Sequence, residues 1–418
     1  MSPGTTYVIG GGLAGLSAAV ALAGQGRAVE VLEGAAQAGG RCRSYFDPQL
    51  GAVIDNGNHL VLSGNSAVEA YLKQIGAADR LAGPDGAAVG FADLKTGEQW
   101  TLRPNDGPLP WWIFSTARRT PGTRPTDYLA LAGLLSPPAG RRIDQVIKCR
   151  GPVWDRLMQP FLLAVLNTAP EEGDAGLAAA VIRETLGRGG RACRPRIAHP
   201  TLAAAFVEPA AAYLEARGHP IRCGRRARAL RFEDGRATAI SMADGEITVG
   251  ADDAVILAVP PWAAQALIPG LDAPDEFRAI VNGHFRIAPP AGAPLMLSLI
   301  GGLAEWVFAF PDRVSVTVSG ADRLLDADRE DLARQLWRDV AQVHGLGPEL
   351  PPWQIVKERR ATFAATPAQN AKRPGVRSAW SNLFLAGDWT DTGLPATIEG
   401  ALRSGRTAAE AALGHRAE

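Results

Sequence analysis

The feature that most restricts the fold is a glycine-rich turn near the N-terminus, placed between a short strand pattern and a helical one. Residues 7–9 (YVI) are β-rich, and GGGLAG follows at residues 10–15. Apolar residues then recur at helical spacing as far as Ala23, and a second strand pattern ends in Glu33, 18 residues beyond Gly15. A strand, a glycine turn, a helix and a strand in this order are typical of a Rossmann-type dinucleotide-binding unit.

The residues of this turn have distinct expected roles. Gly10 permits the tight turn, Gly12 allows a pyrophosphate to approach the backbone, and Gly15 allows the helix to touch the strand. Leu13 and Ala14 begin the helix, where unpaired N–H groups and the positive end of the helix dipole favour a phosphate. We therefore expect a dinucleotide to bind at this turn.

An acid and an arginine extend the predicted site. Glu33 can accept two hydrogen bonds from a ribose diol, and its charge would repel a 2′-phosphate. The sequence GGRCR begins six residues after Glu33. Arg41 within it can place its guanidinium on the pyrophosphate from the opposite side. FAD and NAD are the candidates that these residues favour.

The other end of the chain carries a second candidate ligand site, LFLAGDWTDTGLPATIEGA at residues 383–401. An apolar strand pattern stops at Gly387, and the carboxylate of Asp388 follows at the strand tip. A helix is predicted behind it, with Pro395 in the first helical position, where the missing N–H of proline would be unpaired in any case. The N-terminus of that helix would stabilise negative charge.

Composition limits the class of protein. A chain of 418 residues with 46% apolar and 21% charged residues is expected to form two or three globular domains. The net charge of zero gives no reason to expect nucleic acid as a partner. The four cysteines show no CxxC spacing, so we expect no metal site and no disulfide, and a reducing, cytoplasmic location. Neither a signal peptide nor a membrane-spanning helix is predicted.

Together, the glycine turn with Glu33, GGRCRS at residues 39–44 and LFLAGD at residues 383–388 resemble the flavin amine oxidase and phytoene desaturase superfamily. The resemblance implies an α/β fold in which a Rossmann-like FAD-binding domain carries a discontinuous α+β substrate domain, with FAD bound non-covalently. The FAD-binding domain would comprise residues 1–75, 196–270 and 360–418, and the substrate-binding domain residues 76–195 and 271–359.

The same resemblance implies which residues meet the cofactor. Asp388 would meet the ribityl or pyrophosphate region, and backbone N–H groups of Ala396 and Thr397 would point to the pyrimidine end of the ring. A strand near Ala227 would meet the adenine, and LAVPP, which includes Ala258, would run beneath the cofactor. The full set expected at the cofactor is Gly10, Gly12, Leu13, Ala14, Gly15, Glu33, Gly40, Arg41, Gly57, Asn58, Ala227, Ala258, Gly387, Asp388, Pro395, Ala396 and Thr397.

Three longer motifs narrow the resemblance. WDRLMQPFLLAVLNTAPEE at residues 154–172, DNGNH at residues 55–59 and RRATFAATPAQN at residues 359–370 are similar to the hydroxysqualene dehydroxylases, over nearly the whole chain. One departure is Asn58, where that family commonly has glutamine. The resemblance implies reductive removal of the hydroxyl group from hydroxysqualene, which gives squalene for hopanoid synthesis, with an external electron donor for the flavin.

The chemistry of that reaction suggests further roles. A hydroxyl group beside a double bond can leave as water if it is protonated, and reduced flavin N5 can then deliver hydride to the allylic carbon. His59 is the first candidate for the proton donor, although it could equally bond the cofactor or the backbone. Asn58 and Asp55 are the other catalytic candidates, with turn hydrogen bonding expected for Asp55. Asn167 and Thr168 could bind the substrate hydroxyl, although a helix-capping role is favoured.

An isoprenoid lipid barely dissolves in water, so the enzyme is expected to meet a bilayer. LPWWIFSTARR at residues 109–119 sets tryptophans beside arginines, and YLALAGLLSPP follows at residues 128–138. This pattern suits an anionic lipid surface, but the same side chains could form a core. We predict peripheral membrane contact through residues 109–138, at the inner face of the membrane.

Two other functions remain open on the sequence. The first is an FAD-dependent isoprenoid desaturase or amine oxidase, and the second is a flavin-binding lipid carrier without catalysis. Amine oxidases of the superfamily commonly hold a lysine-linked water at the flavin, but no lysine occurs between Lys148 and Lys357. This gap disfavours the amine oxidase.

Overall fold

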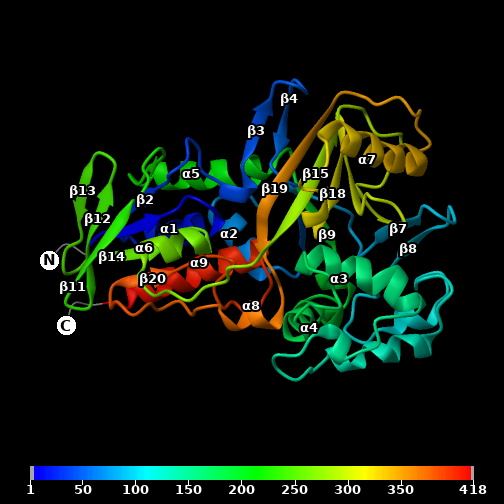
Figure 1. Ribbon diagram of the computed structural model, residues 1–418, viewed down its shortest axis with the longest axis horizontal. Coiled ribbons are helices and arrows are strands. Elements are labelled where there is room, and N and C mark those ends of the chain that lie inside the picture. The colour runs from blue at the N-terminus through cyan, green and yellow to red at the C-terminus, as the bar shows by residue number, and fades with distance from the viewer. Residues whose placement is uncertain (1–3, 416–418) are drawn as a thin grey trace.

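The computed structural model describes residues 4–415, and a five-stranded parallel sheet forms one end of the elongated molecule (Figure 1). In spatial order its strands are β10 (Ile221–Arg222), β2 (Val29–Leu32), β1 (Thr6–Ile9), β14 (Ala254–Leu257) and β20 (Leu383–Leu385). Every pair in the sheet is parallel. The sheet therefore joins strands from the start, the middle and the end of the chain, and the predicted α/β class is confirmed.

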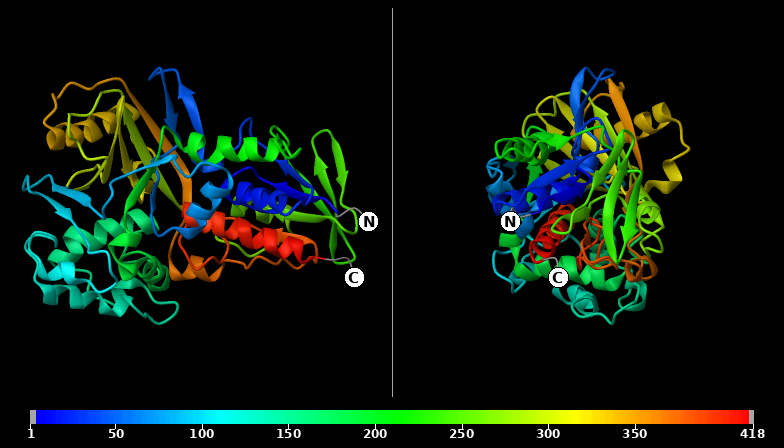
Figure 2. Two further views of the ribbon diagram at one scale, coloured as in Figure 1. Left: turned by 180° about the vertical axis from the view of Figure 1, so that it is seen from behind. Right: turned by 90° about the vertical axis from the view of Figure 1, so that its left-hand side faces the viewer.

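Helices α1 (Leu13–Gly24) and α9 (Ile398–Leu413) lie side by side against this sheet, as both Figure 1 and Figure 2 show. Small residues let the two helices approach closely. A Cβ on Gly405 of α9 would lie 2.0 Å from the carbonyl oxygen of Ala14. The hydroxyl of Ser17 donates to the carbonyl of Leu402 at 2.8 Å. The two ends of the chain are thus packed together.

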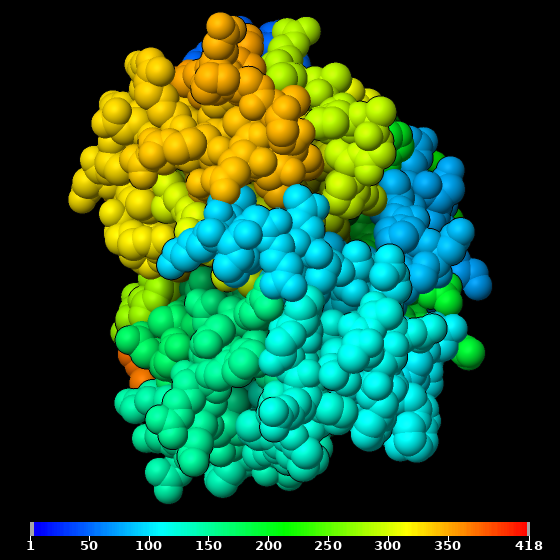
Figure 3. Space-filling view, turned by 90° about the vertical axis from the view of Figure 1, so that its right-hand side faces the viewer, coloured from blue at the N-terminus to red at the C-terminus, as the bar shows by residue number. Residues whose placement is uncertain are grey.

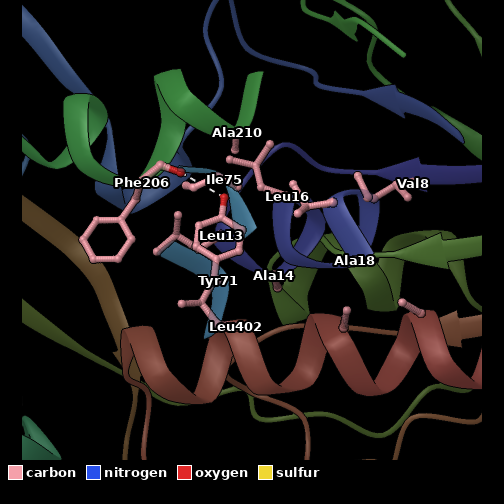
Figure 4. Close-up of a cluster of buried hydrophobic side chains, with 14 of the residues drawn as sticks. Val8, Leu13, Ala14, Leu16, Ala18, Tyr71, Ile75, Phe206, Ala210 and Leu402 are labelled. Carbon is pink, nitrogen blue, oxygen red and sulfur yellow. Dashed lines mark hydrogen bonds between the residues drawn. The ribbon is translucent and has the colours of Figure 1, made fainter. Parts of the chain in front are cut away.

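The core on this side is closed by α2 (Ser66–Gln74) and α5 (Glu208–Glu215), and Figure 4 shows part of it. Apolar side chains of α1 meet Phe206, which precedes α5, and Ile75, which ends α2. The buried hydroxyl of Tyr71 donates to the carbonyl of Phe206 at 2.9 Å, so this hydroxyl is paired within the core.

A three-stranded antiparallel meander lies beside the parallel sheet. Its strands are β11 (Ala229–Glu233), β12 (Arg236–Met242) and β13 (Gly245–Thr248), followed after β14 by α6 (Pro261–Leu267). Asp234-Gly235 and Asp244-Gly245 form the two turns of the meander, with positive φ at Asp234 and at both glycines.

A seven-stranded mixed sheet forms the other end of the molecule. In spatial order its strands are β19 (Trp353–Phe363), β15 (Phe277–Phe285), β18 (Arg313–Val318), β17 (Trp306–Phe310), β16 (Met296–Ile300), β7 (Val89–Asp93) and β8 (Gln99–Leu102). Helix α7 (Arg329–His344) covers one face of this sheet with an apolar stripe that includes Leu332, Leu336 and Val340.

Short strands and helices link the two sheets and complete the second end. They are the hairpin of β3 (Ser44–Asp47) and β4 (Ala52–Asp55), the small sheet of β5 (Leu60–Leu62), β9 (Pro195–Ala198) and β6 (Leu81–Ala82), helices α3 (Gln159–Leu166), α4 (Ala175–Glu184) and α8 (Pro367–Ala371), and 3-10 helices at Trp111–Phe114 and Pro125–Leu134. Strand β19 crosses the expected domain boundary at residue 360, so the two-domain division stays a prediction.

Candidate active site

The N-terminal turn requires glycine at two positions and leaves open space at a third. Gly10 has a φ of +109°, and a Cβ on it would lie 2.4 Å from the carbonyl oxygen of Ala258. A Cβ on Gly15 would lie 1.9 Å from the carbonyl oxygen of Gly10. No protein atom lies within 4 Å of the corresponding position on Gly12, the N-cap of α1, and no side chain caps that helix. The amides that follow Gly12, those of Leu13 and Ala14, are therefore accessible to an anionic group.

Glu33 lies directly beside this turn, at the end of β2. Its carboxylate accepts hydrogen bonds from the backbone N–H of Gly11 at 2.7 Å and of Ala35 at 2.6 Å. The backbone of Gly39 donates to Gly11 at 2.8 Å, which places Gly40 against the same turn. The acid is held in a fixed orientation, and its remaining lone pairs suit a ribose diol.

The two distant motifs meet through an ion pair between Arg41 and Asp388. The Nη2 atom of Arg41 lies 2.7 Å from Oδ1 of Asp388, and Nη1 donates to the carbonyl of Ala361 at 2.6 Å. Burial lowers the pKa of Arg41, but the charge and hydrogen bond of Asp388 outweigh that effect and raise it. The Arg41 side chain is still 42% exposed, against 8% for Asp388, so the guanidinium can also meet a phosphate.

The loop after β20 is held from within by Arg373, which belongs to none of the motifs recognised in the sequence. Arg373 is buried, and its Nη2 donates to the carbonyl of Asp388 at 3.3 Å, to Oγ1 of Thr392 at 3.1 Å and to the carbonyl of Thr390. Gly387 starts the loop with a φ of +152° and donates to Oγ of Ser404. The loop that positions Asp388 is thus fixed from both sides.

The predicted start of the last helix is wrong by three residues. Helix α9 begins at Ile398, so Pro395 precedes the helix instead of occupying its first position. Thr397 is the N-cap, because its Oγ1 accepts a hydrogen bond from the backbone N–H of Gly400 at 3.0 Å. The helix therefore starts after Thr397. Ala396 and Thr397 lie at the helix N-terminus, where their backbone N–H groups can meet a ligand.

The strand expected near Ala227 is β11, which begins two residues after it. Strand β10 ends at Arg222 and β11 begins at Ala229, so Ala227 itself lies in the loop between them. Contact of this segment with the adenine stays a prediction. Ala227 is partly buried against the apolar core.

The segment 55–59 connects the two sheets. The Asp55 carboxylate is buried and accepts from Oγ of Ser44 at 2.6 Å and from the N–H of Leu202 at 2.9 Å. It therefore joins the β3–β4 hairpin to the helical segment that begins at Leu202, and burial raises its pKa. Gly57 faces Asn282 of β15, since a Cβ on it would lie 3.1 Å from Nδ2 of Asn282. The bonds of Asp55 reach residues that are distant in the sequence, so they are not the local turn hydrogen bonds that were predicted for it.

His59 is close to the ion pair of Arg41 and Asp388. Burial and the nearby Arg41 cation lower the pKa of His59 to about 4. The imidazole is therefore neutral near pH 7 and offers a hydrogen bond, whereas an imidazolium acid would need a higher pKa. The role of His59 as proton donor stays a prediction. A neutral imidazole supports that role less than a charged imidazolium would.

Asn58 reaches from this segment to the seven-stranded sheet. Its Nδ2 donates to Oγ1 of Thr317 at 3.1 Å and to the carbonyl of Val316 at 3.4 Å, and its backbone N–H donates to Oδ1 of Asn282 at 3.4 Å. Its Oδ1 is buried and has no partner among the described residues. A buried acceptor without a partner marks a place for a ligand or a water molecule.

Asn167 and Thr168 use their polar atoms within the protein. Asn167 ends α3 with a φ of +48°, accepts from the N–H of Gly320 at 2.7 Å, and donates to Oγ1 of Thr362 at 3.0 Å. Oγ1 of Thr168 accepts from the N–H of Ala365 at 2.9 Å. These bonds give both residues a structural role in joining α3 to the sheet, and substrate binding by them stays a prediction.

A separate apolar patch lies on the segment that was predicted to contact a membrane. It consists of five exposed side chains, namely Leu109, Trp111, Phe114, Leu129 and Leu135. Trp112 is instead buried and packs edge-to-face on Tyr128 at 5.3 Å between ring centroids. The segment therefore supplies both a core residue and a surface. Figure 3 shows the end of the molecule on which this segment, in cyan, lies at the lower right.

Comparisons with known proteins agree with this geometry. A family model described as flavin containing amine oxidoreductase matches residues 13–413, and the chain belongs to that family, whose cofactor here is FAD. Within the family it falls among the hydroxysqualene dehydroxylases. It is 55% identical over 410 residues to the hydroxysqualene dehydroxylase of Rhodopseudomonas palustris, and 53% identical over 411 residues to that of Sinorhizobium fredii, with at least 98% of each chain covered.

A solved structure supports the fold alone. Cyclohexylamine oxidase from Brevibacterium oxydans superposes with a TM-score of 0.71 at 15% identity, over 98% of each chain. The structural elements seen here are thus those of the amine oxidase fold. No helix in residues 4–415 is both long and apolar enough to span a bilayer.

Proposed function

We propose that this protein removes the hydroxyl group of hydroxysqualene reductively and releases squalene. The observation that supports the proposal is the similarity to two hydroxysqualene dehydroxylases, which are 55% and 53% identical to this chain over 98% of its length. The reaction adds two electrons and two protons to the alcohol, forms one C–H bond, breaks one C–O bond and releases one water. An external donor must return two electrons to the flavin in each cycle.

The residues present fit FAD. The open space at Gly12 and the uncapped start of α1 suit the pyrophosphate, Glu33 suits the ribose, and Arg41 with Asp388 suits the pyrophosphate and ribityl region. The N-terminus of α9 suits a negatively charged ring edge. When bound and reduced, FAD supplies a hydride from N5. The chain itself must hold the allylic carbon there, exclude water and deliver a proton to the leaving oxygen.

An amine oxidase reaction has weaker support. Lys357 is the single lysine of the seven-stranded sheet. Its Nζ donates to the carbonyl of Leu325 at 2.9 Å and to that of Ala327, which precede α7. It therefore serves the loop before α7 instead of a water molecule beside the flavin. An isoprenoid desaturase would pass electrons from its substrate to an acceptor. Product analysis therefore distinguishes it from a reductive enzyme.

The test is product analysis under anaerobic conditions. The FAD-loaded protein is photoreduced, mixed with hydroxysqualene, and extracted for gas chromatography. We expect squalene in the amount of reduced flavin present, and none when the flavin stays oxidised. Unchanged hydroxysqualene, together with oxygen consumption on an amine, would replace this proposal with the oxidase. Binding of the lipid without turnover in either direction would favour a carrier.

We further propose that the apolar patch attaches the protein to the inner face of an anionic bilayer. Tryptophan and phenylalanine suit the headgroup boundary. Exposed arginines surround the patch in sequence, namely Arg118, Arg124, Arg141 and Arg142. Apolar insertion and attraction to anionic lipid would act together there.

Liposome flotation tests this attachment. The double substitution Trp111→Ser and Phe114→Ser removes exposed rings and should reduce recovery on anionic vesicles, whereas neutral vesicles should recover little of either protein. The matched control is Phe46→Ser, which removes an equally exposed ring from the β3–β4 hairpin. Trp112 is left intact because it is buried. Equal recovery of all three proteins would rule the patch out.

A further inference from the structure

One face of the seven-stranded sheet carries a row of polar side chains in a buried position. The row consists of Asn282, Thr317, Trp306 and Ser298, one from each of β15, β18, β17 and β16, which stand directly opposite one another across the three strand pairs. Directly opposed residues of antiparallel strands project to the same side. None of the four is more than 8% exposed.

This face is the one turned away from α7. The alternate residues of the same strands, among them Val281 and Val316, pack with α7 in a separate apolar cluster. On the face with the polar row, Asn58 lies over Thr317. Because Asn58 adjoins His59, which is close to the ion pair of Arg41 and Asp388, one end of the row lies on the FAD side of the molecule.

An aromatic surface adjoins the row. One step along the same strands, Met296 stands opposite Phe308, and Phe308 opposite Ser315. Met296, Trp306, Phe308, Phe310 and Ile197 form one buried apolar cluster. The sheet face is thus polar along one line and apolar beside it, which matches a hydrocarbon chain that carries a single hydroxyl group.

Part of the row is satisfied internally. Oγ1 of Thr317 donates to Oδ1 of Asn282 at 2.8 Å and accepts from Nδ2 of Asn58 at 3.1 Å. Three buried atoms have no hydrogen-bond partner among the described residues, namely Oδ1 of Asn58, Nε1 of Trp306 and Oγ of Ser298. Leaving such atoms unpaired costs about 1–3 kcal/mol each, so their clustering needs a partner.

The orientation of the Asn58 amide is fixed by its surroundings. Nδ2 faces the carbonyl oxygen of Val316 at 3.4 Å, and a carbonyl can only accept a hydrogen bond. Turning the amide over would bring two oxygen atoms together. The unpaired atom of Asn58 is therefore an acceptor, whereas Trp306 offers a donor and Ser298 a hydroxyl that can donate.

We propose that this row binds the hydroxyl group of the alcohol substrate, and this rests on the proposed function. Nε1–H of Trp306 and Oγ–H of Ser298 donate hydrogen bonds to the substrate oxygen, and Oδ1 of Asn58 accepts a hydrogen bond from the substrate O–H. Two donors and one acceptor equal the hydrogen-bonding capacity of an alcohol. These bonds bind and orient the hydroxyl group, and the isoprenoid chain lies against the neighbouring aromatic cluster.

Binding of two ligands that differ by the hydroxyl group tests the proposal. Dissociation constants of hydroxysqualene and squalene are measured with the oxidised, FAD-loaded protein, which cannot turn over, in one detergent. Ser298→Ala and Trp306→Phe should each weaken hydroxysqualene binding by about 3- to 10-fold, the loss of one neutral hydrogen bond, and leave squalene binding unchanged. The ratio of the two constants is the readout, because a general packing defect would weaken both ligands.

Ser315→Ala is the matched control. It removes a buried hydroxyl of the neighbouring position on β18 that already bonds Nδ1 of His284 at 2.8 Å, so the ratio should stay at the wild-type value. An unchanged ratio in both row variants would overturn the proposal and assign the three atoms to internal water. If Trp306→Phe fails to fold, the ratio measured with Ser298→Ala tests the proposal by itself, because that substitution removes only one oxygen atom. Wild-type protein that neither binds nor consumes hydroxysqualene would instead refute the proposed function.

Discussion

The two sheets hold their candidate ligand groups in different ways. Beside the five-stranded sheet, the groups are backbone amides at Gly12 and the start of α9, with three side chains that already have protein partners, Glu33, Arg41 and Asp388. On the seven-stranded sheet, the groups are side-chain atoms, and those of Trp306 and Ser298 lack partners. In the first arrangement the side chains are paired before a ligand arrives and only backbone amides stay open, whereas in the second it is the side-chain atoms that need a partner.

This difference predicts opposite tolerance to change. A site built from backbone depends on the space around glycine, so adding one carbon can destroy it. A site built from side chains on a regular sheet keeps its fold when one polar atom is removed, and it loses discrimination between ligands instead.

The largest expected effect separates two glycines of the same turn. Gly15→Ala should destabilise the protein by about 3 kcal/mol or more, because the new Cβ would lie 1.9 Å from a backbone oxygen that cannot move aside. Gly12→Ala meets no protein atom and should leave the stability of the FAD-free protein unchanged. It should still weaken FAD binding by about tenfold or more, equivalent to about 1.4 kcal/mol, because the methyl group occupies the pyrophosphate approach.

Urea unfolding of the FAD-free proteins and FAD titration measure the two effects separately. Gly405→Ala is a useful control, since its Cβ would clash with the carbonyl oxygen of Ala14 at 2.0 Å, away from the phosphate approach. It should lower stability as Gly15→Ala does. If Gly12→Ala bound FAD as tightly as the wild type, the pyrophosphate would not lie at this turn.

The same contrast explains what the sequence could predict. The glycine turn and Glu33 were recognisable because backbone binding requires a fixed local spacing of residue types. The polar row was not, because Asn282, Thr317 and Ser298 become neighbours only through strand register. Register is a property of the assembled sheet, and no local spacing encodes it.

Errors within the nucleotide site have a local cause. Pro395 was placed in the first helical position on its general preference, but the side chain of Thr397 bonds Gly400 and starts the helix later. Proline preference is a weak signal when a capping residue follows within two positions. Arg373 gave no signal at all, because it contacts backbone carbonyls of a loop that is fixed only in the folded chain.

A second prediction compares one histidine of lowered pKa from each region, His59 and His284. The pKa is lowered to about 4 for His59 and to about 3 for His284, chiefly by burial. Since both values lie below that of the unfolded chain, about 6.5, the unfolded state binds more protons in acid. Stability is therefore full above about pH 6.5, and each histidine should remove about 1.4 kcal/mol per pH unit as the pH falls toward its folded pKa.

Urea unfolding at intervals between pH 7 and pH 4 measures this slope. His59→Asn and His284→Asn should each flatten the curve by one proton relative to the wild type. FAD that covers His59 should lower its pKa further and carry the loss to lower pH, whereas the loss at His284 should change less. A wild-type slope retained in His284→Asn would mean that this imidazole is accessible to water in the folded protein.

The smallest expected effect compares helix caps in the two regions. Oγ1 of Thr397 accepts one backbone N–H of α9, and Oδ1 of Asp328 accepts two of α7, from Glu330 at 2.8 Å and Asp331 at 3.1 Å. Thr397→Ala and Asp328→Ala should each cost about 1 kcal/mol of stability. Only the first lies at a helix end that is proposed to meet FAD, so only the first should also weaken FAD binding. Equal FAD affinity in the two variants would remove the start of α9 from the cofactor site and leave the N-terminal turn and the Arg41–Asp388 pair to account for binding.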